Sequence, residues 1–421
     1  MPLPHCGVDF GTSNSSVAWY HQGQATLLPL EEERTSLPSA IFFHADDDGI
    51  SHGQAAINDY LEGYEGRLMR AMKSLLGSPL MEGQTEVQGR ALPFRLLLKH
   101  FIQTLRTRAS LAAGTPFQQA VFGRPVHFVD DDPRNDQLAQ DTLADIAREV
   151  GFEHVEFQYE PLAAAFSYEQ TLQGEQCVMV VDIGGGTSDF SIVRLGPERA
   201  ARLDRQPDIL ATAGVHIGGT DFDKYLSLGS VMPELGLGSA LKSGKDMPST
   251  VYFQLASWHT INQVYSRKQS ALLSTLQRES AAPALLKRLL HVVEQRSGHA
   301  LAMEVERAKI KLTDHPQVQL NLGVAQAGLE HTVTQSDFNH YVGHLVERIS
   351  QAVHDMLQQA QLPANGIDAL YFTGGASAIP VLQTTLSRHF NTQRNIDGDR
   401  FGSICTGLAI DAHRRFGPSN P

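Results

Sequence analysis

A run of apolar residues that leads into an aspartate, with glycine and hydroxyl residues after it, occurs at two places in the chain. One run, Val178–Val181, leads into Asp182, and Ile183, three glycines, Thr187 and Ser188 separate this aspartate from Asp189. An apolar extended pattern then resumes. A valine-rich run bounded by glycines is typical of a fully buried strand. The pattern therefore predicts strand, turn and strand, with polar side chains gathered around the turn.

The same order of residues stands near the N-terminus. Cys6–Val8 leads towards Asp9 and Gly11, hydroxyl residues follow, and apolar residues return at Val17. Two copies of one strand, turn and strand, far apart in the sequence, predict two related lobes that present their turns to a shared cleft. The backbone N–H groups of such turns bind phosphate-sized anions without a positive side chain.

Two better-known glycine motifs also bind phosphate, and both open a helix. Here a strand follows the glycines, so neither motif fits. The remaining alternative is a glycine hairpin without function, because glycine supplies the positive φ of tight turns. The repeated pattern and its nearby aspartates favour anion binding over that alternative.

Strands and helices alternate along the rest of the chain. Further strands are predicted at 37–43 and 120–128, and helices at 96–113, at 138–150 with Gly151 as its cap, from 162, and at 404–416. Residues 211–223 and 367–380 each predict a strand, a glycine pair and the start of a helix. Residues 224–300 predict mostly helix, with a glycine-rich stretch at 232–245.

A helix around residues 305–313 carries charged residues at regular spacing. Spacings of three and seven put Glu306, Lys309 and Thr313 on one face, beside an apolar stripe. A ligand-binding face is one interpretation. An ordinary solvated charged face is the other.

Composition narrows the class of protein. The net charge of −12 argues against nonspecific nucleic-acid binding, which needs a basic surface. The three cysteines, Cys6, Cys177 and Cys405, lack metal-ligand spacing and predict buried thiols in a reducing compartment. The N-terminus leaves no room for a signal peptide, and no apolar run reaches the roughly twenty residues of a membrane span. We therefore expect a cytoplasmic protein.

In their order along the chain, the motifs resemble those of the actin-like ATPase superfamily, and within it the nucleotide-binding domain of DnaK-type heat-shock chaperones, with a short YegD-like branch as the nearest match. The matching segments are VDFGTSNS, MKSLLG, EPLAAAFSY, VVDIGGGTSD, HIGGTDFD, VERAKIKLT and FTGGASAIP. The resemblance implies an α/β actin-like ATPase fold. Each of its two lobes has a ribonuclease-H-like mixed sheet flanked by helices and a smaller inserted subdomain, with a nucleotide cleft between the lobes.

The resemblance also implies a division of the chain. Lobe I is expected at 1–35 and 98–174, with an inserted subdomain at 36–97. Lobe II is expected at 175–214 and 332–421, with an inserted subdomain at 215–331. No peptide-binding domain is expected, because the sequence stops at RRFGPSNP without a hydrophobic linker.

Roles around the phosphates follow from the same resemblance. The phosphate-binding residues are Gly11, Thr12, Ser13, Asn14, Gly184, Gly185, Gly186 and Thr187. Hydrated Mg²⁺ is assigned to Asp9, Glu160 and Asp182, with K⁺ as a candidate second ion. The catalytic group is Lys73, Glu160, Asp182, Thr187 and Asp189, with Lys73 on the γ-phosphate. Two like charges about 5 Å apart repel by roughly 3 kcal/mol at an effective dielectric near 20, so these carboxylates need a metal to face a triphosphate.

The adenosine site is implied in the same way. Its residues are Gly218, Gly219, Glu306, Lys309, Ile310, Thr313, Gly374, Gly375, Ala376 and Ala378. The family usually has arginine in place of Ile310, and serine and a second arginine in place of Ala376 and Ala378. Arginine stacking on a ring contributes about 0.5 to 2 kcal/mol, so adenine binding is expected to be about tenfold weaker.

A relay of Pro125, Arg134 and Glu160 links the nucleotide to interdomain movement in the family. For Arg134, an ordinary surface position is the alternative.

These features predict an ATP- and ADP-binding, magnesium-dependent, slowly hydrolysing chaperone-like ATPase that acts through lobe closure on an unknown protein partner or client. The expected reaction is weak conversion of ATP and water to ADP and phosphate. We expect a monomer, with no nucleic-acid or membrane partner.

Three alternatives stay open. A sugar-type small-molecule kinase would need an acceptor pocket and a further general base. A filament-forming protein would need self-complementary surfaces. The third is a nucleotide sensor or degenerate scaffold that no longer hydrolyses ATP.

Overall fold

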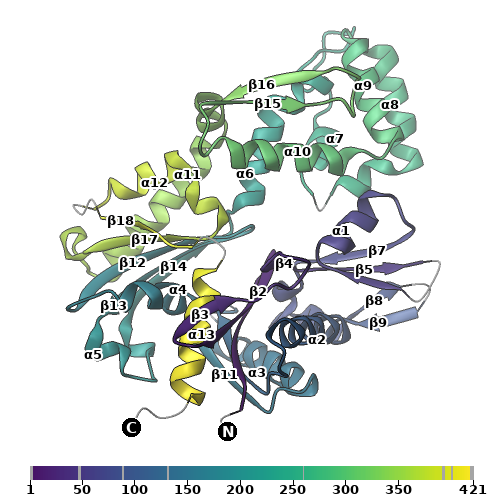
Figure 1. Cartoon of the computed structure of the whole chain (residues 1–421). Helices are drawn as coiled ribbons and strands as arrows, with labels where there is room; N and C mark the ends of the chain where they lie inside the picture. The colour runs from purple at the N-terminus through teal and green to yellow at the C-terminus, as the bar shows by residue number, and fades with distance from the viewer. Residues whose placement is uncertain are drawn as a thin grey trace. The chain divides into compact units, whose positions relative to one another are not determined.

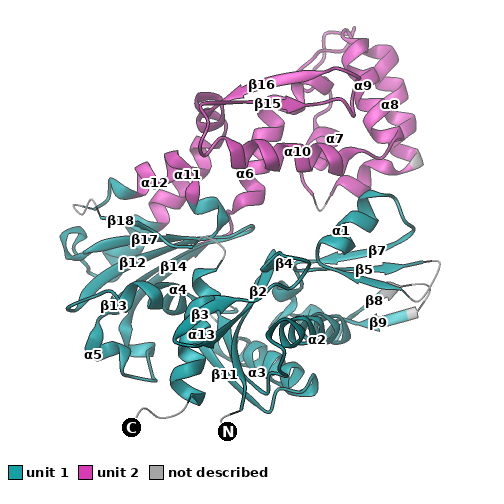
Figure 2. Cartoon of the chain, viewed as in Figure 1, with its two compact units in different colours: residues 1–214, 353–377, 387–421 teal, residues 215–352, 378–386 magenta. Residues whose placement is uncertain are grey.

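The structure is a computed structural model, and it describes residues 3–45, 49–87, 90–129, 132–258, 260–390, 394–399 and 402–417. The chain forms two compact units (Figure 2). Unit 1 contains residues 1–214, 353–377 and 387–421, and unit 2 contains residues 215–352 and 378–386. Each unit is described by itself below.

The first sheet of unit 1 is built around the N-terminal hairpin (Figure 1). Its strands run in the order β11-β10-β1-β2-β3, and β4 also pairs with β2. The hairpin strands β1 and β2 are antiparallel, whereas β1, β10 and β11 are parallel. The bounds are β1 His5–Phe10, β2 Asn14–His21, β3 Gln24–Leu27, β4 Ser36–Pro38, β10 Gln119–Arg124 and β11 His154–Tyr159.

The second sheet repeats this arrangement. Its order is β14-β13-β12-β17-β18, with β12 antiparallel to β13 and parallel to β17, which is parallel to β18. The bounds are β12 Gln176–Ile183, β13 Ser188–Leu195, β14 Ile209–Val215, β17 Ala369–Thr373 and β18 Asn395–Asp397. Both predicted strand, turn and strand patterns are therefore confirmed.

Two helices join the sheets within unit 1. Helix α13 (Ser403–Phe416) packs on β1, β2, β3 and β10, and α4 (Glu160–Glu169) packs on α13, β12 and β13. A Cβ atom on Gly407 would overlap the Ala163 carbonyl, so the helices approach closely. The two sheets, which we expected in separate lobes, thus lie in one compact unit. The predicted four-part division of the chain stays a prediction.

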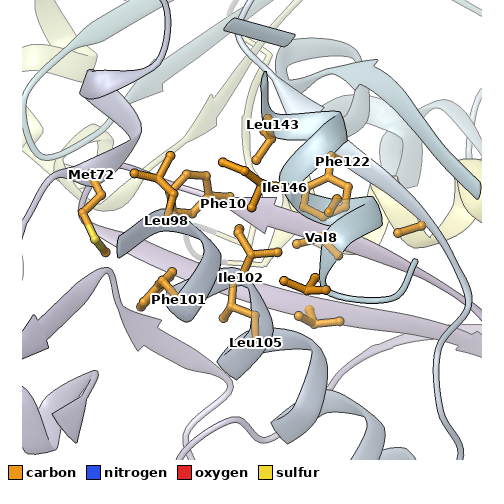
Figure 3. Packing of buried hydrophobic residues seen from close by; sticks show 14 of the residues in the cluster. Val8, Phe10, Met72, Leu98, Phe101, Ile102, Leu105, Phe122, Leu143 and Ile146 are labelled. Atoms are coloured by element: carbon orange, nitrogen blue, oxygen red, sulfur yellow. The ribbon is translucent and has the colours of Figure 1, made fainter. Parts of the chain in front are cut away.

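Helices α2 (Phe94–Ala113) and α3 (Pro133–Glu149) bury their apolar faces against the first sheet. Figure 3 shows this core, in which side chains of the sheet meet Phe101 and Ile102 of α2 and Leu143 and Ile146 of α3. Gly151, with φ of 104°, follows the end of α3 as predicted. The helix begins at Pro133, earlier than predicted. The Asp132 side chain caps its N-terminus by accepting a hydrogen bond from the Asn135 N–H, and proline fits the first turn of a helix.

The segment between β4 and α2 forms a small sheet and short turns. Strands β5 (Ala40–His44), β6 (Ile50–His52) and β7 (Gly66–Arg70) pair in the order β6-β5-β7, with α1 (Gln54–Leu61) beside them. A 3₁₀ turn at Met72–Leu75, a second at Pro79–Glu82 and the hairpin β8 (Gln84–Val87) with β9 (Arg90–Pro93) complete it. Strand β10 ends at Arg124, four residues before the predicted end, because Pro125 cannot continue the ladder.

Unit 2 is mainly helical, as predicted for 224–300. Its elements are α6 Gly219–Leu226, α7 Thr250–Leu255, α8 Arg267–Glu279, α9 Pro283–Glu294, α10 Gly298–Lys311, β15 Gln317–Asn321 and β16 Glu330–Thr334. Helix α11 (Gln335–Gln359) begins there and ends in unit 1, and α12 is Pro380–Ser387. We did not predict the β15–β16 hairpin. Helix α10 ends at Lys311, so placing Thr313 on its face was wrong.

Cys6 and Cys405 are buried and Cys177 is half-buried, and all three thiols are free. Within the ranges given above, no helix combines the length and the apolar character needed to cross a bilayer.

Candidate functional site

The turns of the two hairpins meet in unit 1. A Cβ atom placed on Gly185 would overlap the Oγ of Ser13, so the backbone of the second turn lies directly against the first turn. This contact joins segments that are far apart in the sequence. Asp9 and Asp182, each the last but one residue of its strand, therefore lie near each other beside the two turns.

The first turn is tight and is braced from outside. A side chain at Gly11 would overlap the Asn14 carbonyl, which is why glycine is needed there. The Ser39 hydroxyl donates to the Gly11 carbonyl at 2.7 Å and shares a 2.8 Å hydrogen bond with Ser15. Sequence reasoning missed Ser39, and no motif marks this serine between two strands.

The second turn carries more polar side chains. Its backbone is closed by a 3.0 Å hydrogen bond from the Gly184 N–H to the Thr187 carbonyl. The Thr187 hydroxyl donates to Asp189 at 2.8 Å, and Asp182 pairs in register with Asp189. Gly374, which follows β17 with φ of 80°, approaches so closely that its Cβ would lie 2.5 Å from the Asp182 Oδ1.

Lys73 reaches this place from the 3₁₀ turn at Met72–Leu75. Met72 anchors the turn, because its side chain is buried in the core beside the first sheet (Figure 3). The Lys73 Nζ donates to the Glu160 Oε1 at 2.5 Å, and the lysine side chain is only 11% exposed. Glu160 is the first residue of α4, where the helix dipole favours a carboxylate.

Two aspartates of the hairpins, Asp9 and Asp182, have raised pKa values. Burial and the Glu160 carboxylate raise the pKa of Asp9 to about 7, although Lys73 opposes this. Burial, followed by the Asp189 charge, holds the pKa of Asp182 well above its usual range. Burial opposes the charged form of Lys73, but the carboxylates, with Glu160 first, outweigh it and raise its pKa. Carboxylates outnumber ammonium groups here, which favours a bound cation.

The donor set fits a hydrated divalent ion. In the described part of the chain, no three His, Cys, Asp or Glu side chains form a group that could hold a metal by themselves. Mg²⁺ usually keeps several waters and takes one or two carboxylates together with substrate phosphates. Asp9, Glu160 and Asp182 are the residues that would hold such an ion. Bound there, the ion would neutralise phosphate charge.

In unit 2, the predicted glycine pair and lysine come together. The Lys309 Nζ on α10 donates to the Gly219 carbonyl at 3.1 Å and to Asp223 on α6 at 2.8 Å. Lys309 is only 8% exposed, so the solvated-face interpretation is wrong for this residue. Burial raises the pKa of Asp223 to about 6 despite Lys309. Sequence reasoning missed Asp223 because its partner is far along the chain.

The other adenosine residues differ in exposure. Glu306 is exposed and Ile310 is 58% exposed on α10, and the Thr313 hydroxyl donates to the Ile310 carbonyl just beyond the helix. Ala376 and Ala378 are buried. Gly218 donates its N–H to Asp221 at 3.0 Å, and Gly375 is exposed.

The predicted site residues thus form two sets. One set lies in unit 1, around the two turns and the lysine and glutamate pair, and includes Thr12, Asn14, Gly186, Gly374, Gly375 and Ala376. The other set, Gly218, Gly219, Glu306, Lys309, Ile310, Thr313 and Ala378, belongs to unit 2. Arg134 of the predicted relay is exposed on α3.

Two paired mixed sheets, each with an acidic hairpin, define an actin-like ATPase fold. The sequence model described as Hsp70 protein matches residues 5–230 and 291–417. The chain therefore belongs to the Hsp70 family. Residues 231–290 lie outside the match.

Two relatives illustrate the extent of the similarity. The chain is 25% identical over 438 residues to the chaperone protein dnaK of Cyanidioschyzon merolae, across 96% of this chain and 61% of that protein. It is 26% identical over 418 residues to the chaperone protein DnaK of Elusimicrobium minutum, across 96% of this chain and 57% of that protein. The chain thus spans about three fifths of the length of these relatives.

Proposed function

We propose that this protein binds ATP and ADP with Mg²⁺ and hydrolyses ATP slowly, as a chaperone-like ATPase. The contact between Gly185 and Ser13 carries the proposal, because it brings two anion-binding turns and two half-buried aspartates to one place. Family membership supports adenine nucleotides over other polyphosphates.

Each site residue in unit 1 has a defined task in this proposal. The turn N–H groups bind the phosphates, and Lys73, fixed by Glu160, stabilises charge on the phosphate that is transferred. Asp189 accepts a hydrogen bond from Thr187, and this pair orients the attacking water. The acids of the site hold hydrated Mg²⁺, with K⁺ as a further candidate ion.

The adenosine end is proposed to lie on α10, with Lys309 and Glu306 at the ribose. Ile310 offers an apolar surface but no cation for the adenine ring, so affinity is expected to be about tenfold below that of an arginine-bearing site. The relatives named as chaperone proteins support a protein partner or client, reached through nucleotide-dependent movement. Residence in a reducing cytoplasm is proposed from the three free thiols.

Isothermal titration with ATP and ADP, in Mg²⁺ and in EDTA, tests the proposal. We expect binding that depends on Mg²⁺ and that Asp182→Asn weakens at least about tenfold, or about 1.4 kcal/mol. Asp145→Asn, which changes an exposed aspartate on α3, is the matched control. Wild-type protein that ignores both nucleotides in both buffers would contradict the proposal.

Turnover separates the remaining classes of function. Phosphate release should be slow and unchanged by added sugars, whereas a kinase would consume ATP only with its acceptor. Sedimentation should be the same with and without ATP, whereas a filament-forming protein would pellet. Affinity in the submicromolar range would count against weakened adenine binding.

A further inference from the structure

Arg124 stands at the end of β10, directly before Pro125, and no motif of the site includes it. The residue is only 7% exposed, which is rare for arginine unless its charge is paired. Its guanidinium donates to Asp136 on α3 at 2.7 Å and to the Gln140 side chain at 2.6 Å. Two further N–H groups reach the carbonyls of Pro125 and Val126 at 3.0 and 3.1 Å. Four of its five donors are therefore committed.

The guanidinium also lies between two rings. Its carbon is 5.3 Å from the ring centre of Phe128 and 5.3 Å from that of Tyr159. Asp136 closes the group by accepting the Phe128 N–H at 2.5 Å. Burial would raise the pKa of Asp136, but the hydrogen bonds from Arg124 and Phe128 outweigh it and lower the pKa. The ion pair thus stays charged at neutral pH.

This group of contacts adjoins Glu160. Arg124 pairs in register with Tyr159, the last residue before Glu160. Gly123, the residue before Arg124, faces the Glu160 side chain, because a Cβ added to Gly123 would be 3.1 Å from the Glu160 Cγ. The guanidinium therefore contacts Tyr159, the residue before Glu160, and belongs to the residue after Gly123, whose backbone faces the Glu160 side chain.

We propose that Arg124 is a positioning residue for Glu160: by gripping Tyr159, Phe128 and the first turn of α3, it fixes where the Glu160 carboxylate meets Lys73. This inference rests on the proposed function for its kinetic consequence only. Lysine cannot replace Arg124, because an ammonium neither forks to several acceptors nor stacks flat between rings.

Because Arg124 borders a surface pocket of about 270 Å³, the proposal can be tested by chemical rescue with free guanidinium ion. Arg124, Gln140 and Tyr159 help to line it. Removing the Arg124 side chain leaves a gap that opens to this pocket, so guanidinium ion from solution can enter. Arg148 lines the same pocket but is 54% exposed and pairs with Asp145 of its own helix. Arg148→Ala is therefore the matched control.

The kinetic test measures kcat and the Kd of Mg-ATP. Loss of a partner behind a catalytic carboxylate costs about 10- to 100-fold, so Arg124→Ala and Arg124→Lys should lose kcat by this factor while Kd changes less than about threefold. Millimolar guanidinium should restore Arg124→Ala, ammonium should not, and Arg148→Ala should respond to neither. A kcat within about twofold of wild type in a folded Arg124→Ala variant would overturn the inference.

A nucleotide-free readout separates this inference from the proposed function. Acylation of Lys73, followed by mass spectrometry, should quicken several-fold in Arg124→Ala and return to the wild-type rate with guanidinium, while exposed Lys311 keeps its rate. The isosteric Asp136→Asn variant, which keeps Arg124 in place, should give a smaller change in the same direction and serves if Arg124→Ala does not fold. Unchanged Lys73 acylation in both variants would overturn the inference even if ATP binds. Wild-type protein without ATP binding would defeat the proposed function and leave this readout valid.

Discussion

The two hairpins of unit 1 share a topology and differ in what faces their aspartates. Asp9 on β1 pairs with Ser16 on β2, whereas Asp182 on β12 pairs with Asp189 on β13. One hairpin therefore brings a single carboxylate to the site and the other brings two, with the Thr187 hydroxyl bound to the second. A repeated backbone does not impose repeated chemistry.

The hairpins also differ in how their turns are held. The first turn is supported by Ser39, a residue of another segment, which bonds the Gly11 carbonyl. The second turn closes on itself through Gly184 and is approached by Gly374. In the proposed function, the first hairpin mainly lines the phosphate site, and the second hairpin carries the reacting groups.

The largest effect is expected from filling the space beside the second hairpin. Gly374→Ala places a methyl group 2.5 Å from the Asp182 carboxylate at a positive φ, and should cost about 2 to 4 kcal/mol of unfolding free energy. Gly123→Ala, beside the first hairpin, meets the side chains of Glu160 at 3.1 Å and Leu408 at 3.2 Å and should cost roughly 1 kcal/mol. Urea unfolding measures both. Equal losses would contradict the difference between the hairpins.

A second prediction exchanges the residues that face the two aspartates. Asp189→Asn should lower kcat for ATP hydrolysis by about 100-fold, the lower range for losing a positioned acid or base, with nucleotide affinity nearly kept. Ser16→Ala, at the matching register position, should change kcat less than about threefold. Single-turnover phosphate release measures the hydrolysis rate of both variants. A comparable loss in both variants would show that the hairpins contribute alike.

The third prediction concerns pH. The fold keeps a proton on Asp9 up to about pH 7, whereas the unfolded chain releases it near pH 4. Native protein thus holds an additional proton at Asp9 between these values, so the contribution of Asp9 to the stability of metal-free protein should fall as the pH rises from about 4 to 7. Mg²⁺ competes with the same proton, so Mg-ATP should bind more tightly at pH 8 than at pH 6.

Asp9→Asn isolates this contribution. The wild-type free energy of unfolding in EDTA, minus that of Asp9→Asn, should fall across this range, while the difference to Asp145→Asn stays flat. In Asp182→Asn the difference should have the same sign, because the pKa of Asp182 is also raised. If the difference in unfolding free energy between wild type and these variants grew with pH, the raised pKa values of Asp9 and Asp182 would be refuted.

The smallest effect is expected at Ser39. Ser39→Ala removes the hydrogen bond that supports the first turn and should cost about 1 kcal/mol of stability, with a few-fold loss of ATP affinity. Ser274→Ala, which changes an exposed serine whose hydroxyl donates to Ser270 of the same helix, is the control and should have no measurable effect. Loss of stability with unchanged affinity would limit Ser39 to a structural role.

Sequence pattern predicted the features that are local. Each acidic hairpin is marked by apolar residues, an aspartate and a glycine turn, and Gly151 marks the end of α3. The β15–β16 hairpin was not predicted, because β15 has two buried apolar residues, Val318 and Leu320, and so short an alternation does not stand out in the sequence.

The side-chain partners of the site could not be predicted in the same way. Lys309 meets Asp223 across two helices, and Arg124 meets Asp136 and Tyr159 from three segments. Charged residues of this kind occur on most surfaces, and only the packing of the elements shows which ones are buried and paired.

The packing of β1 against α13 has a consequence for synthesis of the chain. The Cys405 thiol donates to the Gly7 carbonyl across 398 positions, and the backbones of Gly7 and Ala409 nearly touch. On the ribosome, at about 5 to 20 residues per second, the first strand would therefore wait roughly 20 to 80 s for the helix that covers it. During that interval a member of a chaperone family is itself a nascent polypeptide with an uncovered apolar strand.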